Sequence, residues 1–154
     1  MSNLILVPFD GAPASVEALR SACGTARLEG SAVVALYVAR VPRQLPLSAG
    51  LPSLAKEAER LRLLSEEIGR GAYATVWPEW VWARDTARAV VDVAEELGVR
   101  QIVIGLEPSS RFFGFLAPWS AVARIITTAP CPVLLHSLPG AKTARPTVAP
   151  GLSR

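Results

Sequence analysis

The sequence predicts a single α/β domain in which helices cover both faces of a largely parallel sheet. Five short apolar runs alternate with four segments whose apolar residues recur at helical spacing. The runs are continuously apolar, which is typical of strands buried on both faces. The length of 154 residues suits one hydrophobic core, since a domain usually holds roughly 100 to 200 residues. These observations predict an open three-layer sandwich.

The first part of the chain reads as strand, helix and strand. The first strand is expected over residues 3–8 (NLILVP), followed by the turn FDG. A helical pattern begins at Ala14, and Gly30 marks its end. A second apolar run at 32–38 completes a βαβ unit, whose crossover should be right-handed. Residues 39–52 contain three prolines and no periodicity, which indicates a loop.

The next helix and strand carry less regular signals. Ser53 is the expected N-cap of a helix whose apolar stripe runs from Leu54 to Ile68. Residues 73–83 have the composition of a strand, but Pro78 lies among them. Because proline has no N–H for a sheet ladder, this strand is expected at an edge or after a bulge.

The last part of the domain alternates again between helices and strands. Asp85 is the expected N-cap of a third helix that Gly98 ends. A fourth strand is expected at 101–104, a helix near 118–128 and a fifth strand at 133–136. These assignments complete five strands and four helices.

Composition and charge exclude several classes of protein. Apolar residues make up 51% and charged residues 19%, which excludes a disordered or low-complexity chain. We expect a folded domain over residues 1–138 and a disordered tail over 139–154, where no periodic pattern remains. Residues 1–138 carry 13 basic and 13 acidic side chains, so the net charge of +3 lies in the tail. A domain without excess positive charge cannot replace many counterions on a phosphate backbone, so nucleic-acid binding is not expected.

The sequence also predicts neither a membrane span, nor export, nor a metal site. No apolar stretch approaches the roughly 18 residues that a spanning helix needs. The first ten residues lack a basic leader and a cleavage site. Cys23 and Cys131 are too few for a disulfide framework, and His136 is the only histidine. We therefore expect a cytoplasmic protein without a metal, in which Cys131 is a small core residue.

Four sequence pieces carry a resemblance to a known family. They are ILVPFDG, with Ser15 and the Ala18-Leu19 pair downstream, ARDTARAVV at 83–91, VRQIVIG at 99–105 and APCPVLL at 129–135. In this order and spacing they resemble the universal stress protein family over roughly residues 1–137. The resemblance implies a sheet of order 3-2-1-4-5, a crevice between the ends of strands 1 and 4, and a homodimer paired through the last strand, Val133 to His136.

Many members of that family bind ATP through a glycine-rich loop after strand 4. Residues without a Cβ let backbone N–H groups approach phosphate oxygens there. In this sequence Gly105 is present, but Pro108 stands at the second glycine position and Pro118 or Trp119 at the third. Gly114 lies in the loop at the wrong register. We therefore expect tight ATP binding of the family kind to be absent.

A smaller or differently posed adenine nucleotide remains an alternative, and no other cofactor is expected. In open α/β sheets the ligand crevice lies beyond the carboxyl ends of the strands. The candidate ligand-binding residues there are Asp10, Gly11, Val38, Gly105, Arg111 and Ser120. In nucleotide-binding relatives Asp10 lies by the adenosine part of the ligand. Arg111 and Arg124 are candidates to supply positive charge in place of backbone donors.

Each of these candidates also has a purely structural interpretation. Asp10 precedes a glycine and is equally suited to an Asx turn with its own backbone. Ser120 is suited to capping its own helix, and Arg111 to simple solvation.

One expected function and three hypotheses from different classes follow. The expected function is a non-catalytic stress-response or regulatory dimer, and the alternative is a binding module for AMP or ATP. An ATP hydrolase would need a base in the crevice, where Asp10 is the only acid that the sequence places. A pure interaction protein would have a crevice filled by Phe112, Phe113 or Trp119.

Three tryptophans cluster on the suspected edge strand. Trp80 and Trp82 share one face, while Trp77 points to the other. We expect the helix over 54–68 to cover them, and the alternative is an aromatic docking surface for an unidentified protein partner.

Overall fold

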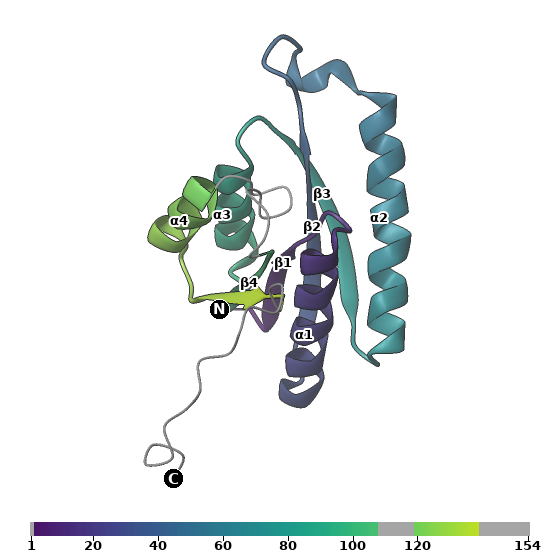
Figure 1. The fold of residues 1–154 in the computed structure, drawn as a ribbon, viewed down its shortest axis with the longest axis vertical. Coiled ribbons are helices and arrows are strands. Elements are labelled where there is room, and N and C mark those ends of the chain that lie inside the picture. The colour runs from purple at the N-terminus through teal and green to yellow at the C-terminus, as the bar shows by residue number, and fades with distance from the viewer. Residues whose placement is uncertain (1, 108–118, 139–154) are drawn as a thin grey trace, which may run out of the picture.

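The computed structural model describes residues 2–107 and 119–138, and Figure 1 shows a sheet between two layers of helices. The strands are β1 (Leu4–Pro8), β2 (Ala32–Arg40), β3 (Val76–Ala83), β4 (Gln101–Leu106) and β5 (Val133–Ser137). The helices are α1 (Pro13–Glu29), α2 (Pro52–Gly71), α3 (Thr86–Leu97) and α4 (Trp119–Thr128), with a short helical turn η1 (Leu47–Ala49). All strand pairs are parallel and the order is β3-β2-β1-β4-β5, which confirms the predicted fold.

The central strand explains why the apolar runs are continuous. Ile5 and Val7 of β1 pack with residues of α1 and α2, whereas Leu6 packs with residues of α3 and α4. All three side chains are fully buried. Burying such a side chain contributes roughly 1.5–3 kcal/mol, so both faces of the strand stabilise the fold.

Several predicted boundaries are wrong. β2 extends to Arg40, and η1 lies within the segment 39–52 that is predicted as a loop. α2 begins at Pro52 without a side-chain cap, so Ser53 lies inside the helix and is not its N-cap. Proline suits the first helical position because its fixed φ is helical and the N–H it lacks would have no partner there. β3 begins at Val76 rather than at Tyr73, which has a φ of 53° in the turn between α2 and β3.

The edge position predicted for the proline-containing strand is confirmed. β3 pairs with β2 on one side, and among the described residues no strand lies on its other side. Trp77 and Trp80 remain 51% and 42% exposed, so the prediction that α2 covers the tryptophans is wrong for these two. The side chains of an edge strand have a neighbouring strand on one side only, which leaves large rings partly in solvent.

Candidate functional site

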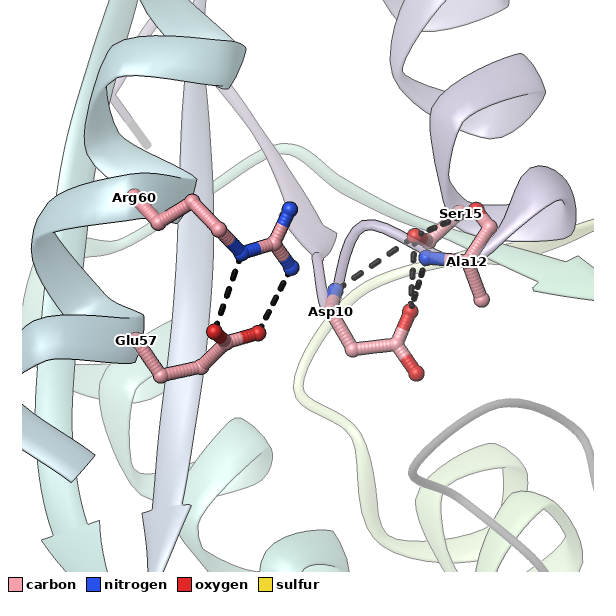
Figure 2. Close-up of polar contacts among 5 residues, drawn as sticks. All are labelled: Asp10, Ala12, Ser15, Glu57 and Arg60. Carbon is pink, nitrogen blue, oxygen red and sulfur yellow. Dashed lines mark hydrogen bonds and ion pairs between the residues drawn. The ribbon is translucent and has the colours of Figure 1, made fainter. Parts of the chain in front are cut away.

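The turn after β1 holds Asp10 at the carboxyl edge of the sheet. Asp10 Oδ1 accepts hydrogen bonds from the backbone N–H of Ala12 (2.9 Å) and from Ser15 Oγ (2.8 Å), as Figure 2 shows. The bond to Ala12 is an Asx turn, so the structural interpretation of Asp10 is confirmed. Oδ2 has no hydrogen-bond partner among residues 2–107 and 119–138. Among the described residues, one carboxylate oxygen of Asp10 therefore remains without a donor.

Gly11 is required by the turn and by α2. Its φ of +79° is a conformation that residues with a side chain rarely adopt. A Cβ at this position would lie 2.8 Å from Leu61 Cδ2 and 3.2 Å from Arg60 Nη2. α2 thus packs directly on the turn, and this packing accounts for Gly11 without a ligand.

Gly105 is explained by contact between β4 and α1. A Cβ built there would lie 2.9 Å from the Ser15 nitrogen and nearer still to the carbonyl group of Ala14. These are backbone atoms of the first turn of α1, which cannot rotate away as a side chain could. The absence of a Cβ at Gly105 therefore lets the strand and the helix pack closely.

The remaining predicted ligand contacts are spread over the fold. Val38 is 2% exposed and packs in the core beneath α3, so only its backbone can face the crevice. Ser120 lies inside the first turn of α4 and is exposed, whereas a cap would precede the helix. Arg111 and the aromatic residues 112 and 113 lie outside the described residues.

Arg124 is already paired within the protein. Its guanidinium donates to both carboxylate oxygens of Asp85, at 3.2 and 2.6 Å. Asp85 Oδ1 also accepts from the backbone N–H of Arg88, which confirms Asp85 as the N-cap of α3. The hydrogen bond from Arg124 is the largest cause that lowers the pKa of Asp85. Arg124 thus joins α4 to the start of α3, and its charge is not free for a ligand.

α2 brings two further charged residues to the Asp10 turn, which the sequence did not single out. Glu57 binds Arg60 through two hydrogen bonds of 2.9 and 2.6 Å, and Figure 2 shows this pair facing Asp10. The hydrogen bond lowers the pKa of Glu57. Burial is the main cause that raises the pKa of the Tyr37 hydroxyl, Glu57 and Asp10 raise it further, and Arg60 lowers it. The i,i+3 spacing of acid and arginine predicts the pair, but not that it faces the crevice.

Two further observations concern the described residues only. None of their His, Cys, Asp and Glu side chains form a group of three suited to a metal ion. None of their helices is both long and apolar enough to cross a membrane.

Comparison with known proteins identifies the family. The model of the universal stress protein family matches residues 1–136, which is most of the chain. The chain belongs to the universal stress protein family. No curated protein matches the sequence.

Solved universal stress proteins share the fold at low sequence identity. One from Archaeoglobus fulgidus is 24% identical, with a TM-score of 0.67 over 86% of this chain and 91% of that chain. A structure from the same organism in complex with dAMP is 20% identical, with a TM-score of 0.67 over 88% and 97% of the chains. A universal stress protein in complex with cAMP is 16% identical, with a TM-score of 0.65 over 86% and 94%. These similarities support the universal stress protein fold observed here.

Proposed function

We propose that this universal stress protein is a non-catalytic regulatory or stress-response module that does not bind ATP tightly. The observation that carries the proposal is the packing of Gly105 against the first turn of α1. The one family glycine that the chain retains therefore has a structural role. Pro108 replaces the second glycine and offers no N–H to a phosphate oxygen.

The state of the carboxylates supports a non-catalytic role. A general base needs a carboxylate oxygen aimed at the attacking water. Both oxygens of Glu57 bind Arg60, so this carboxylate is not placed to act as a base. Oδ1 of Asp10 holds its own turn, and hydrolysis through Oδ2 would need the triphosphate that the proposed module does not bind tightly. The proposed function therefore does not include hydrolysis of ATP, and we place the module in the cytoplasm.

The proposed module is a homodimer formed through β5, over Val133 to His136. β5 is the last strand of the described sheet, and Leu134 on it is 45% exposed. An edge strand with an exposed leucine is suited to pairing with a second copy. Light scattering should give twice the chain mass, and Leu134→Arg should give the monomer mass. A wild-type monomer at micromolar concentration would contradict the dimer.

A second candidate function is the binding of an adenine mononucleotide. Oδ2 of Asp10, which accepts from none of the described residues, is an acceptor suited to a ribose hydroxyl. One phosphate needs fewer backbone donors than three, so the loss of two glycines affects a mononucleotide less. The relatives solved with dAMP and with cAMP make this the nucleotide class to test.

Thermal unfolding with each nucleotide tests both candidates. A ligand at 100 times its Kd stabilises the folded state by about 2.7 kcal/mol, which raises Tm by several degrees. We expect no change in Tm with 1 mM ATP, although this concentration is on the order of a hundred times the Kd of a tight ATP site. A clear increase with ATP would contradict the main proposal.

An increase in Tm with AMP alone would support the second candidate. Asp10→Asn keeps the Oδ1 acceptor of the turn and replaces the charged Oδ2, so it should abolish that increase. Glu17→Gln, on the partly exposed side of α1, is the matched control and should leave it unchanged.

A further inference from the structure

A cavity of about 120 Å³ lies between α2 and the sheet, separate from the Asp10 turn. Its walls come from the end of β1, from β2 and β3, and from one face of α2. The cavity exists because small side chains meet there: Ala35 of β2 and Pro78 of β3 oppose Ala55 and Ala58 of α2. Leu61 of the same helix also lines the cavity, whereas Ile68, two turns further along, is buried against the sheet.

Three aromatic rings line this cavity. Phe9 is 1% exposed, Tyr37 is half-buried, and Trp80 is partly open to solvent at the mouth. Trp82 holds Trp80 in place through an edge contact, with ring centroids 4.9 Å apart and an interplanar angle of 66°. The face of an aromatic ring carries partial negative charge, so rings around a cavity favour a cationic guest.

The charged residues of the cavity add to this preference. Glu59 and Arg62 of α2 line it, and Arg62 donates to Glu59 at 2.6 and 2.9 Å and to Glu66, outside the cavity, at 3.0 and 3.1 Å. Two carboxylates thus bind the single guanidinium, and these three side chains together carry a net charge of −1. This excess of negative charge favours a cation over an anion.

We propose that this cavity binds a small organic cation, an alkylated ammonium group that fits among Phe9, Tyr37 and Trp80. Alkyl groups on the nitrogen suit the apolar walls and lower the cost of removing the charge from water. The aromatic rings attract the charge over their faces. Glu59 on α2 adds negative charge at the rim of the cavity. The cavity lining does not include Asp10 or Gly11, although Phe9 directly precedes them in the chain.

Nuclear magnetic resonance of the tryptophan indole N–H groups offers a direct test. Tetramethylammonium chloride is the probe, tert-butanol is a neutral molecule of similar shape, and sodium chloride controls for ionic strength. We expect tetramethylammonium to shift the Trp80 signal in a saturable manner. The Trp77 signal should stay in place, because this ring lies on the opposite face of β3. Equal effects of tert-butanol and the cation, or no saturable shift, would overturn the proposal.

Four variants separate the contributions of shape, ring and charge. Ala58→Leu fills the cavity and should abolish the shift, while Trp80→Leu should weaken binding by about 3- to 30-fold. Glu59→Gln changes only charge at an exposed lining position and should weaken binding by about two- to fivefold with the fold intact. Trp77→Leu, the control, should bind as the wild type does. Wild-type affinity in both Trp80→Leu and Glu59→Gln would refute the site.

Discussion

Replacing Gly105 by alanine tests the close packing between β4 and α1. The φ of Gly105 is not positive, so alanine can adopt its backbone conformation. On backbone grounds alone, such a change should stabilise the protein by about 0.4–1 kcal/mol, because it reduces the entropy of the unfolded chain. The new Cβ, however, would lie within 3.0 Å of three backbone atoms of Ala14 and Ser15. The local packing therefore reverses the expected sign.

The expected cost of this substitution follows from overpacking a core contact. Such insertions destabilise by about 1–3 kcal/mol, and the atoms involved here belong to a helix backbone rather than to a mobile side chain. For a domain of this size the loss corresponds to a fall in Tm of roughly 2–12 °C. Urea unfolding followed by circular dichroism should show a lower midpoint with an unchanged slope.

Gly24 provides a matched control for the same substitution. It lies in the exposed middle of α1, and a Cβ there would meet no atom within 4 Å. Gly24→Ala should stabilise the protein by roughly 0.5–1 kcal/mol through helix propensity. A Gly105→Ala variant as stable as the wild type, beside a stabilised Gly24→Ala, would refute the packing argument.

Three other predictions concern separate parts of the fold. Asp85→Ala should cost about 1 kcal/mol at pH 7 through loss of the α3 cap. The hydrogen bond from Arg124 lowers the pKa of Asp85 in the folded protein. The stability contributed by the Asp85 carboxylate is therefore fully present above the pKa that Asp85 has in the unfolded chain, and it is lost as the pH falls through the folded pKa. The urea midpoints of Asp85→Ala and the wild type should accordingly converge in acid. In urea unfolding, Leu61→Ala should lower the free energy of unfolding by about 2–5 kcal/mol, because Leu61 is buried. Leu63→Ala, on the exposed face of α2, should lower it by less than about 0.5 kcal/mol. Equal losses of stability would show that α2 is oriented differently. Burial raises the pKa of the Cys23 thiol to about 11, so at pH 8 a disulfide reagent should modify it only in urea, and rapid modification in buffer would contradict its burial.

Local sequence signals were enough for most of the fold. Continuous apolar runs predicted the strands because parallel strands between two helical layers are buried on both faces. Asp85 and Gly98 correctly marked the ends of α3, since caps depend on a few adjacent residues. The Ser53 prediction failed because Pro52 begins the helix two residues before the start that a cap at Ser53 implies. Such errors at boundaries arise where two local signals compete.

The functional surface depended on contacts between distant segments. The sequence predicted the Asx turn of Asp10 as one of two interpretations, and hydrogen bonding within five residues decides it. No local pattern showed that Glu57 and Arg60 would face this turn, because that depends on which side of α2 meets the sheet. The close packing of the retained Gly105 against α1 likewise could not be predicted, because it joins segments far apart in the chain.

The amino-acid sequence by itself determined the order and type of the elements, the neutral charge of residues 1–138 and the loss of two family glycines. These are properties of neighbouring residues and of their periodicity along the chain. Only the tertiary structure decided that Gly105 accommodates a helix and that small residues of α2, β2 and β3 enclose an aromatic cavity. Such features arise from how side chains of segments far apart in the chain fill, or fail to fill, the space between them.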